Sequence, residues 1–381
     1  MKILHFSDTH LGYSNFDIVN EKGINTREQD FYDAFEFVFS QIREIKPDII
    51  LHTGDFFHRP TPSNRAMTFV LEQFKNISDL NIPFIIIAGN HSTPKTIYTS
   101  PILKALKTLI NVYPIFDQKY EVIQLDNVAI HGLPHINDIR VQAEELDKVS
   151  LIPNKRNILM LHTSLGKKYL MDEYGEQVFP EEKIELLKQF DFIALGHWHN
   201  FQKVTILDNA YYSGSLERMS DSECMHEKGY CILEFNDKDP IIPVFIPIPT
   251  RKWHKIDILG CHQKSISDIT VELNSFKEQY ITQGCILNIN FQGIKLDQSL
   301  ELSNGNIKNI FDDVFNISIK RTSYTENNII SQIETGSFDK LDNSFAEFIK
   351  MKYSDEQIAS LLIEKSNYYF NKHSTENQND N

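Results

Sequence analysis

The chain has 381 residues and a formal net charge of −14, from 38 Lys and Arg against 52 Asp and Glu. Its length exceeds that of one small module and predicts two or three domains. The acidic balance argues against a protein that holds nucleic acid by bulk positive charge. No apolar run approaches the roughly 20 residues that a membrane span requires, and the N-terminal segment soon turns polar, so we expect neither a membrane anchor nor a secretory signal.

The sequence contains four cysteines, Cys224, Cys231, Cys261 and Cys285. No two of them have the close spacing of a zinc-binding motif. Because we expect no export signal, we predict reduced thiols in a cytoplasmic protein.

Strands and helices alternate in the first hundred residues. Three buried strands are predicted, at residues 2–7, 48–52 and 84–88. Between them, apolar positions repeat at helical spacing over residues 29–46, and Pro47 ends that helix. Ser63 can cap a second helix. This alternation predicts an α/β layered fold.

After about residue 110 the pattern becomes richer in strands. Asp126-Asn127 separates two short strand-like segments and predicts a hairpin turn. Further strands are predicted at residues 157–162, 192–196, 210–214 and 230–235. Residues 240–249 contain four prolines. They predict an edge strand or an extended connector, because proline cannot donate to a sheet ladder.

The remainder of the chain divides into smaller parts. We predict a first domain over residues 1–250 and a small α+β domain, with one helical stretch, over residues 251–330. A polar linker (331–344), two short helices that form a hairpin (345–372) and a disordered tail (373–381) follow.

Five short polar signals come directly after predicted strands. They are Asp8-Thr9-His10, Gly54-Asp55, Gly89-Asn90-His91, His162 and Gly196-His197-Trp198-His199. Ligand sites of α/β sheets collect where strands end and loops begin. Five such ends therefore predict one shared site.

Seven side chains of these signals are of types that bind metals: Asp8, His10, Asp55, Asn90, His162, His197 and His199. Imidazole, carboxylate and amide oxygen together suit Mn²⁺, Fe²⁺ or Zn²⁺. They are too many for one catalytic ion with an open position, and they suffice for two ions that share a bridging carboxylate. A glycine before Asp55, Asn90 and His197 would let the backbone turn tightly. Each motif alone is weak, and the two aspartates could instead cap turns, so the prediction depends on the ordered set.

The ordered set D-x-H, G-D, G-N-H, H and G-H-x-H resembles the calcineurin-like metallophosphoesterase superfamily. Residues 3–12, 54–63, 162–164 and 212–217 resemble SbcD-type DNA repair nucleases in particular. The resemblance implies an α/β sandwich of two mixed sheets flanked by helices. It also implies a smaller α+β capping domain that helps to place DNA, and a C-terminal helical hairpin.

The resemblance also implies a role for each residue of the motifs. Asp8, His10, Asp55 and His199 would hold a first metal, and Asp55, Asn90, His162 and His197 a second. Asp55 would bridge the two. His91 would lie beside the scissile phosphate as a catalytic residue, and His58 is similar to a further histidine linked to nucleolytic processing. The family usually has aspartate after G-N-H, whereas this chain has Ser92, which leaves the pKa and the orientation of His91 open.

The function implied by the resemblance is that of a Mn²⁺-dependent DNA nuclease, with Mg²⁺, Fe²⁺ or Zn²⁺ as alternatives. It would be an exonuclease on duplex ends and an endonuclease on hairpin or single-stranded DNA, in which two metals activate a hydroxide. Its partner would be an SMC-like, SbcC-type ATPase that docks on the helical hairpin. The chain itself lacks the G-x-x-x-x-G-K-[ST] motif of ATP hydrolysis. We further expect a homodimer through helices of the catalytic domain, and a cytoplasmic, nucleoid-associated location.

Two alternatives stay open from the sequence. The chain could be another phosphoesterase of this fold, such as a cyclic-nucleotide phosphodiesterase or a phosphoprotein phosphatase. It could instead be a DNA-end-binding scaffold without turnover, for which Ser92 is the only support. Candidate phosphate contacts, each weighed against an ordinary surface charge, are Arg59, Lys95, Arg140, Lys167-Lys168 and Arg218.

Overall fold

The computed structural model describes residues 1–324 except 95, 97, 172–175, 177, 237–238 and 281. It also describes residues 349, 360, 362–363 and 365–366. The chain divides into two compact units, Met1–Ser323 and Tyr324–Asn381. The predicted linker and tail lie outside the described residues, as does nearly all of the predicted helical hairpin. The predicted domain boundaries stay predictions.

The first unit contains two six-stranded mixed sheets. In the first sheet the order is β12 (Pro243–Pro247), β11 (Gly229–Glu234), β1 (Lys2–Phe6), β2 (Ile49–His52), β3 (Phe84–Ile87) and β4 (Val112–Ile115). β1 to β4 are parallel, whereas β11 and β12 pair antiparallel. The proline-rich segment is thus an edge strand, one of the two outcomes predicted for it.

In the second sheet the order is β5 (Glu121–Gln124), β6 (Val128–Leu133), β7 (Arg156–His162), β8 (Phe192–Gly196), β10 (Ala210–Tyr212) and β9 (Gln202–Lys203). β6, β7, β8 and β10 are parallel. β5 and β6 form the hairpin predicted at Asp126-Asn127.

The two sheets pack face to face through a fully buried apolar layer. One half of this layer comes from β1, β2 and β3, with residues such as Ile3 and Leu51, and the other half from β6, β7 and β8, with residues such as Ile130 and Phe192. Alternate residues of β1 point to opposite faces, so Leu4 and Phe6 enter the other core, beneath the helices. Strands buried on both faces explain the nearly continuous apolar runs of the sequence.

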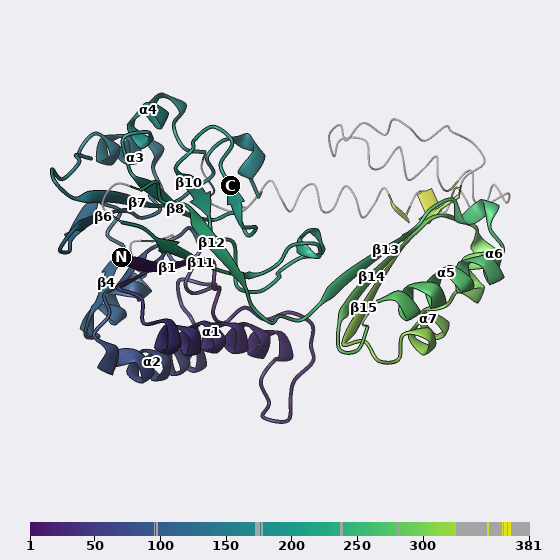
Figure 1. The fold of residues 1–381 in the computed structure, drawn as a ribbon. Helices are drawn as coiled ribbons and strands as arrows, with labels where there is room; N and C mark the ends of the chain where they lie inside the picture. The colour runs from purple at the N-terminus through teal and green to yellow at the C-terminus, as the bar shows by residue number, and fades with distance from the viewer. Residues whose placement is uncertain are drawn as a thin grey trace. The chain divides into compact units, whose positions relative to one another are not determined.

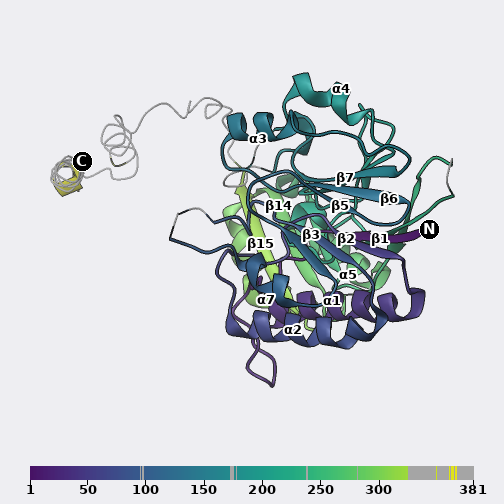
Figure 2. The ribbon, with the colours of Figure 1, turned by 90° about the vertical axis from the view of Figure 1, so that its left-hand side faces the viewer.

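Helices cover the outer faces of the sandwich. α1 (Thr26–Ile45) and α2 (Asn64–Ile77) lie against the first sheet, as Figures 1 and 2 show. α3 (Ile139–Leu146) and α4 (Ile184–Leu187) lie on the side of the second sheet. The predicted sandwich of two mixed sheets flanked by helices is confirmed.

The ends of α1 and α2 follow from local chemistry. Ser63 caps α2 as predicted, because its side chain accepts the backbone N–H of Ala66. α1 begins earlier than its apolar stripe suggested, since the side chain of Asn25 accepts the N–H groups of Arg27 and Glu28. It ends at Lys46, which adopts the left-handed conformation before Pro47.

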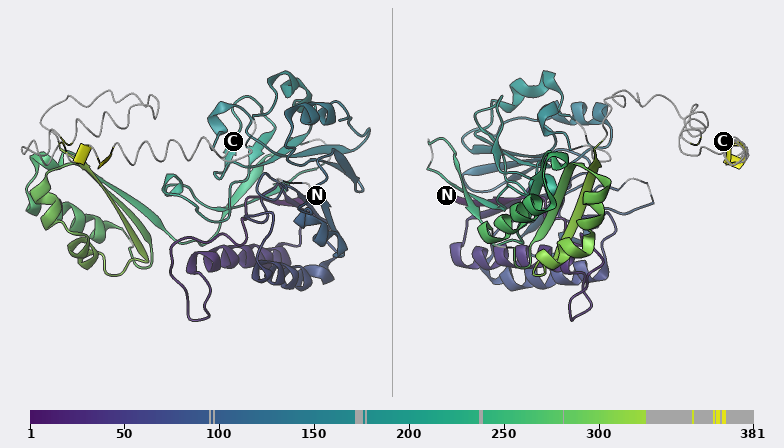
Figure 3. Two further views of the ribbon diagram at one scale, coloured as in Figure 1. Left: turned by 180° about the vertical axis from the view of Figure 1, so that it is seen from behind. Right: turned by 90° about the vertical axis from the view of Figure 1, so that its right-hand side faces the viewer.

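The segment predicted as a small α+β domain contains strands and helices, as expected, and the structure adds their order and direction. Its three strands, β13 (Trp253–Ile258), β14 (Ile286–Ile294) and β15 (Asn316–Ser323), are all parallel and form a third sheet. Three helices, rather than the predicted one, connect them: α5 (Ile266–Gln279), α6 (Leu296–Glu301) and α7 (Asn304–Ile310). The helices gather on one face of the sheet (Figures 1 and 3). Parallel strands need such crossovers, and the short helices α6 and α7 carry too little periodicity to be recognised in the sequence.

This third sheet has an apolar core of its own. Ile258, Leu287 and Phe291 of the strands pack with Ile269 and Leu273 of α5. Among the described helices, none combines the length and the apolar character that crossing a bilayer requires.

Candidate metal centre

The five polar signals meet where strands of both sheets end. Asp8, Asp55 and Asn90 follow β1, β2 and β3, which are neighbours in the first sheet. His162 is the last residue of β7, and His197 directly follows β8, its neighbour in the second sheet. Because β1, β2 and β3 are parallel to one another, and β7 is parallel to β8, the carboxyl ends of each set share one edge. Packing of the two sheets brings the two edges together.

Asp55 lies at the centre of the predicted ligands. Its Oδ2 atom is 3.1 Å from Nε2 of His162 and 3.9 Å from Nε2 of His10. The same His162 nitrogen lies 2.9 Å from Oδ1 of Asn90. Asp55 is therefore within reach of residues from both predicted metal sites, as a bridging carboxylate would be.

A second group of side chains surrounds Asp8. Ligand atoms of Asp8, His10 and His199 lie within 4.8 Å of one another, and so do those of Asp8, Asp55 and His162. Nε2 of His10 is 3.2 Å from Nε2 of His199. The backbone N–H of His197 donates to both oxygens of Asp8, at 3.1 Å. All seven predicted ligands are thus gathered in one buried site.

Several of these residues adopt an unusual backbone conformation. Asp8, His10 and Asp55 have φ values of 51°, 40° and 50°, and His197 has 97°. Positive φ is uncommon for residues other than glycine and costs free energy. Such strain persists where the surrounding structure fixes it, and here it accompanies four of the seven predicted ligands.

The glycines of the motifs provide space as well as turns. Gly54 has φ 103°, and a Cβ atom there would overlap the ring of His162. Gly89 and Gly196 have no positive φ, and a Cβ atom would overlap Asp55 at the first and the carbonyl of Thr53 at the second. The predicted tight turn therefore applies to Gly54, whereas close approach of neighbours explains the other two.

His58 and His91 lie beside this site. Their rings stack with centroids 5.2 Å apart, and Nδ1 of His58 is 3.4 Å from Nδ1 of His10. Nδ1 of His91 is 3.0 Å from the backbone carbonyl of His58, and its backbone N–H donates to Asp55. The orientation of His91 therefore has support from the carbonyl of His58, although Ser92 replaces the usual aspartate.

Burial and mutual attraction set the pKa values of the side chains in the site. Burial opposes the ionisation of Asp55, but the imidazoles of His162 and His91 hold its pKa well below the usual range. Burial also disfavours a charged His162, yet Asp55 and Asp8 outweigh it and raise its pKa to about 9. Burial holds the pKa of His10 well below its ordinary value. Burial raises the pKa of Asp8, so the charges of Asp55 and His162 are the ones that favour each other most clearly.

The donor set fits divalent cations. Nitrogen and oxygen atoms from different loops converge within a few ångströms of one another, and no thiol is among them. Nε2 of His10 and Nε2 of His199 face each other, and the pKa of His162 is raised. Both features indicate a place where a bound cation would offset the negative charge of the carboxylates. Asp8, His10, Asp55 and His199 would hold one ion, and Asp55, Asn90, His162 and His197 the other.

Two further carboxylates were missed by the sequence reasoning. Oε1 of Glu176 lies 2.7 Å from Nε2 of His197, and Oε1 of Glu223 lies 3.2 Å from Nδ1 of His199. Carboxylates commonly accept the second ring N–H of a metal-binding histidine and so fix its orientation. Neither glutamate belongs to a recognisable motif, so no signal in the sequence could have identified them.

The candidate phosphate contacts differ in their exposure to solvent. Arg59 is exposed directly after His58 and stays a prediction. Arg218 is only 4% exposed, and its guanidinium donates to the carbonyls of His226 and Arg251 and to Thr250. Its guanidinium is therefore buried and bonded within the protein. The prediction that Arg218 contacts phosphate is wrong. Lys95 lies outside the described residues.

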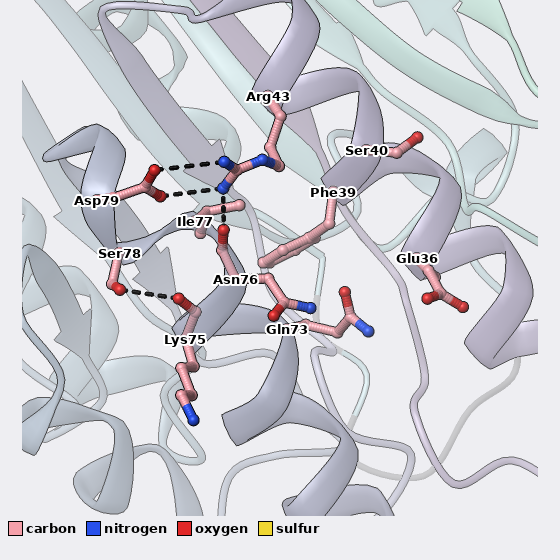
Figure 4. Close-up of a pocket in the computed structure, with 10 residues that line it drawn as sticks. All are labelled: Glu36, Phe39, Ser40, Arg43, Gln73, Lys75, Asn76, Ile77, Ser78 and Asp79. Atoms are coloured by element: carbon pink, nitrogen blue, oxygen red, sulfur yellow. Dashed lines mark hydrogen bonds and ion pairs between the residues drawn. The ribbon is translucent and has the colours of Figure 1, made fainter.

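A surface cleft elsewhere on the catalytic region holds none of the predicted ligands. It has a volume of about 510 Å³ and lies between α1 and the end of α2, where Arg43 pairs with Asp79 (Figure 4). Both side chains of the pair are largely exposed. This cleft is not the site of the chemistry.

Comparison with known proteins places the chain in a family. The profile of the calcineurin-like phosphoesterases matches residues 1–201, which contain all seven predicted ligands. The chain belongs to the calcineurin-like phosphoesterase family. It is 28% identical to the "DNA double-strand break repair protein Mre11" of Sulfolobus acidocaldarius, over 95% of this chain and 94% of that protein.

A protein of the same name from Sulfurisphaera tokodaii is 30% identical, over 74% of this chain and 70% of its own length. Among solved structures, a dimetal phosphatase from Danio rerio matches 61% of this chain and 91% of that one, with a TM-score of 0.39 and 10% identity. The predicted resemblance to the SbcD and Mre11 type is confirmed, and so is the prediction of a metal-dependent hydrolase of phosphoesters.

Proposed function

We propose that this phosphoesterase is a Mn²⁺-dependent DNA nuclease that acts in double-strand break repair. The observation that carries the proposal is the extent of the likeness to Mre11. The family profile ends at residue 201, whereas the similarity to the Sulfolobus protein covers 95% of the chain. The likeness therefore includes the third sheet, which a minimal phosphatase would not need. This favours a nuclease over a general phosphatase or cyclic-nucleotide phosphodiesterase.

The proposed chemistry is hydrolysis of a phosphodiester. When bound, two divalent cations would lower the pKa of a water nucleophile and neutralise charge on the phosphate. Asp55 lies between the two ligand sets, and the N–H of His197 holds the carboxylate of Asp8 in place. His91, half-buried beside these residues, would donate a proton to the leaving oxygen. His58 supports it through the carbonyl contact.

Digestion of end-labelled DNA tests this proposal. Duplex, hairpin and single-stranded DNA would be incubated with Mn²⁺, beside a cyclic nucleotide and a phosphopeptide. We expect exonuclease products from duplex ends and cleavage of hairpins, and no activity in Asp55→Asn, because this change removes the charge of the proposed bridging ligand. Mg²⁺, Fe²⁺ and Zn²⁺ in parallel would identify the preferred metal.

The same panel separates the alternatives. Turnover of small phosphoesters without cleavage of DNA would favour a phosphatase or a cyclic-nucleotide phosphodiesterase. Binding of DNA ends with no turnover under any metal would favour the scaffold. The contact between His91 and the carbonyl of His58 weakens the argument for a scaffold, because the absence of aspartate at Ser92 does not leave His91 unsupported.

We further propose an SMC-like, SbcC-type ATPase as the partner, docked on residues 345–372. These residues belong to the second compact unit, Tyr324–Asn381. A chain that ends at Ser323 should keep its nuclease activity on short DNA and lose binding to the ATPase in a pull-down. An unstable or insoluble product would instead indicate that the segment packs on its own chain. If the proposal holds, a cytoplasmic, nucleoid-associated location is expected.

A homodimer through α1 and α2 is also part of the proposal. α2 presents Leu71, which is 42% exposed, and the partly exposed Met67 and Phe69 lie near it in sequence. An apolar surface of this kind suits contact with a second copy. Sedimentation of the wild type and of Leu71→Asp would show whether this surface forms a dimer.

A further inference from the structure

A buried ion pair lies behind the candidate metal centre. Glu223 ends the short 3₁₀ turn Asp221–Glu223, and Lys228 precedes β11. They are 4% and 1% exposed, and Oε2 of Glu223 is in direct contact with Nζ of Lys228. Removing two charges from water is costly, so a buried pair of this kind is weak evidence for stability. Its contacts indicate another purpose.

The pair holds His199 at two points. Oε1 of Glu223 lies 3.2 Å from ring Nδ1 of His199, and Nζ of Lys228 donates to the backbone carbonyl of the same residue at 2.8 Å. Lys228 also donates to Oγ of Ser215 at 2.8 Å. One contact therefore fixes the ring and the other fixes the backbone that carries it.

This arrangement determines which ring nitrogen is free to bind a metal. A neutral imidazole has a single N–H, and if Nδ1 donates it to Glu223, Nε2 keeps its lone pair. That Nε2 atom is the one that lies 3.2 Å from Nε2 of His10, and both histidines belong to the group with Asp8. The carboxylate thus selects the tautomer that a cation at Asp8, His10 and His199 requires.

We propose that Glu223 is a positioning residue whose side-chain oxygen holds His199 in the Nδ1–H tautomer and leaves Nε2 free to bind the metal. The inference rests on the proposed role of His199 as a ligand. Glu223 acts through its contact with His199, so it is a positioning residue. It lies outside every motif that identified the site.

Two double variants test the proposal. Glu223→Met with Lys228→Met removes the pair and the acceptor together. Glu223→Gln with Lys228→Met removes the pair but keeps an oxygen that can accept the N–H of Nδ1. Because both lack Lys228, neither leaves an unpaired buried ammonium, and a comparison between them isolates the contact to the ring. Glu145→Gln is the remote control, since Glu145 is also buried and paired with a lysine, Lys148.

Two measurements are made on each protein. Long-range ¹H–¹⁵N spectra of ¹⁵N-histidine-labelled protein without metal report the tautomer of His199. Calorimetric titration with Mn²⁺ reports the affinity of each site. We expect the Met/Met variant to lose the fixed tautomer and to bind Mn²⁺ at least about tenfold more weakly at one site. The Gln/Met variant and Glu145→Gln should retain both properties.

The proposal is overturned if the folded Met/Met and Gln/Met variants show the same tautomer and bind Mn²⁺ alike. Equal weakening by Glu145→Gln would also overturn it, since the effect would then be a general loss of stability. The spectra need neither metal nor DNA. A wild type that shows the fixed tautomer but cleaves no DNA would count against the proposed function alone.

Discussion

At the scale of single residues, the site depends on charge that is buried before any metal binds. Asp55 stays ionised despite its burial because imidazoles surround it, and His162 takes up a proton in turn. A metal must displace that proton, so binding should release protons and weaken as the pH falls. His58 and His91 lie beside these side chains, with their rings stacked.

His91→Ala should separate catalysis from metal binding. If His91 is a proton donor, turnover of DNA should fall by about 100-fold or more while Mn²⁺ affinity is unchanged. Nitrogen atoms of His91 lie within 4.8 Å of those of His10 and His58, so a role as a ligand is the competing explanation. Parallel loss of Mn²⁺ affinity and turnover would support that explanation. His254→Ala, in β13, is the control and should change neither quantity.

At the scale of elements, the site is made by the ends of strands and the loops that leave them. Asp8, Asp55 and His197 have positive φ there, and the glycines before Asp55 and His197 leave room for neighbouring loops. The strands themselves are ordinary apolar segments. The strands hold the first residues of five loops at fixed positions. This fixed surrounding structure lets the strained backbone conformations persist.

Gly89→Ala should damage the site without changing its ligands. The added Cβ atom would overlap the carboxylate of Asp55, so that side chain must move away from His162. We expect weaker Mn²⁺ binding and lower activity, measured by calorimetric titration and DNA digestion. Gly305→Ala in α7 is the matched control, because the nearest atom to its new Cβ would be 3.8 Å away. Retention of full Mn²⁺ affinity by Gly89→Ala would show that Asp55 does not need its present position.

At the scale of the first unit, a polar junction joins α1 to the start of the third sheet. The guanidinium of Arg251 makes two bonds to Asp30, at 2.6 and 2.7 Å, and a third to the carbonyl of Gly284. Arg27 also donates to Asp30 and lies 3.6 Å from Glu217. The backbone N–H of Arg251 donates to Glu217, which the sequence had singled out within the segment 212–217. Glu217 of that motif therefore has a structural role, because it binds Arg251 and lies close to Arg27.

Asp30→Asn should weaken this junction. Arg27 and Arg251 would lose the carboxylate they share, and an unpaired, partly buried charge is costly, so the free energy of unfolding should fall by about 2 kcal/mol or more. Thermal or urea unfolding would measure the change. Glu272→Gln breaks a more exposed pair with Lys264 within the third-sheet region and should cost less than about 1 kcal/mol. Equal effects of the two changes would contradict a special role for the junction.

Local patterns in the sequence were enough to predict α1, α2, most of the strands around the site and the types of its ligands. Apolar periodicity located α1 and α2. The short polar motifs after strands contain Asp8, His10, Asp55, His162 and His199, whose ligand atoms lie close together, and Asn90 and His197, which both lie beside His162. These signals are local, because periodicity and caps depend on neighbours a few residues apart. The sequence did not predict that the strands of the third sheet are parallel, because strand direction depends on crossover connections rather than on local pattern.

The tertiary structure alone decided which groups support the ligands. Glu223 reaches His199 from 24 residues away, and the carbonyl of His58 reaches His91 from 33 residues away. It also decided that Arg218 serves the interior rather than phosphate. Such contacts cannot be recognised from motif spacing or from composition. Any segment of the chain that packs beside the histidine can supply the carboxylate or the carbonyl. Only the tertiary packing of the chain fixes which one does.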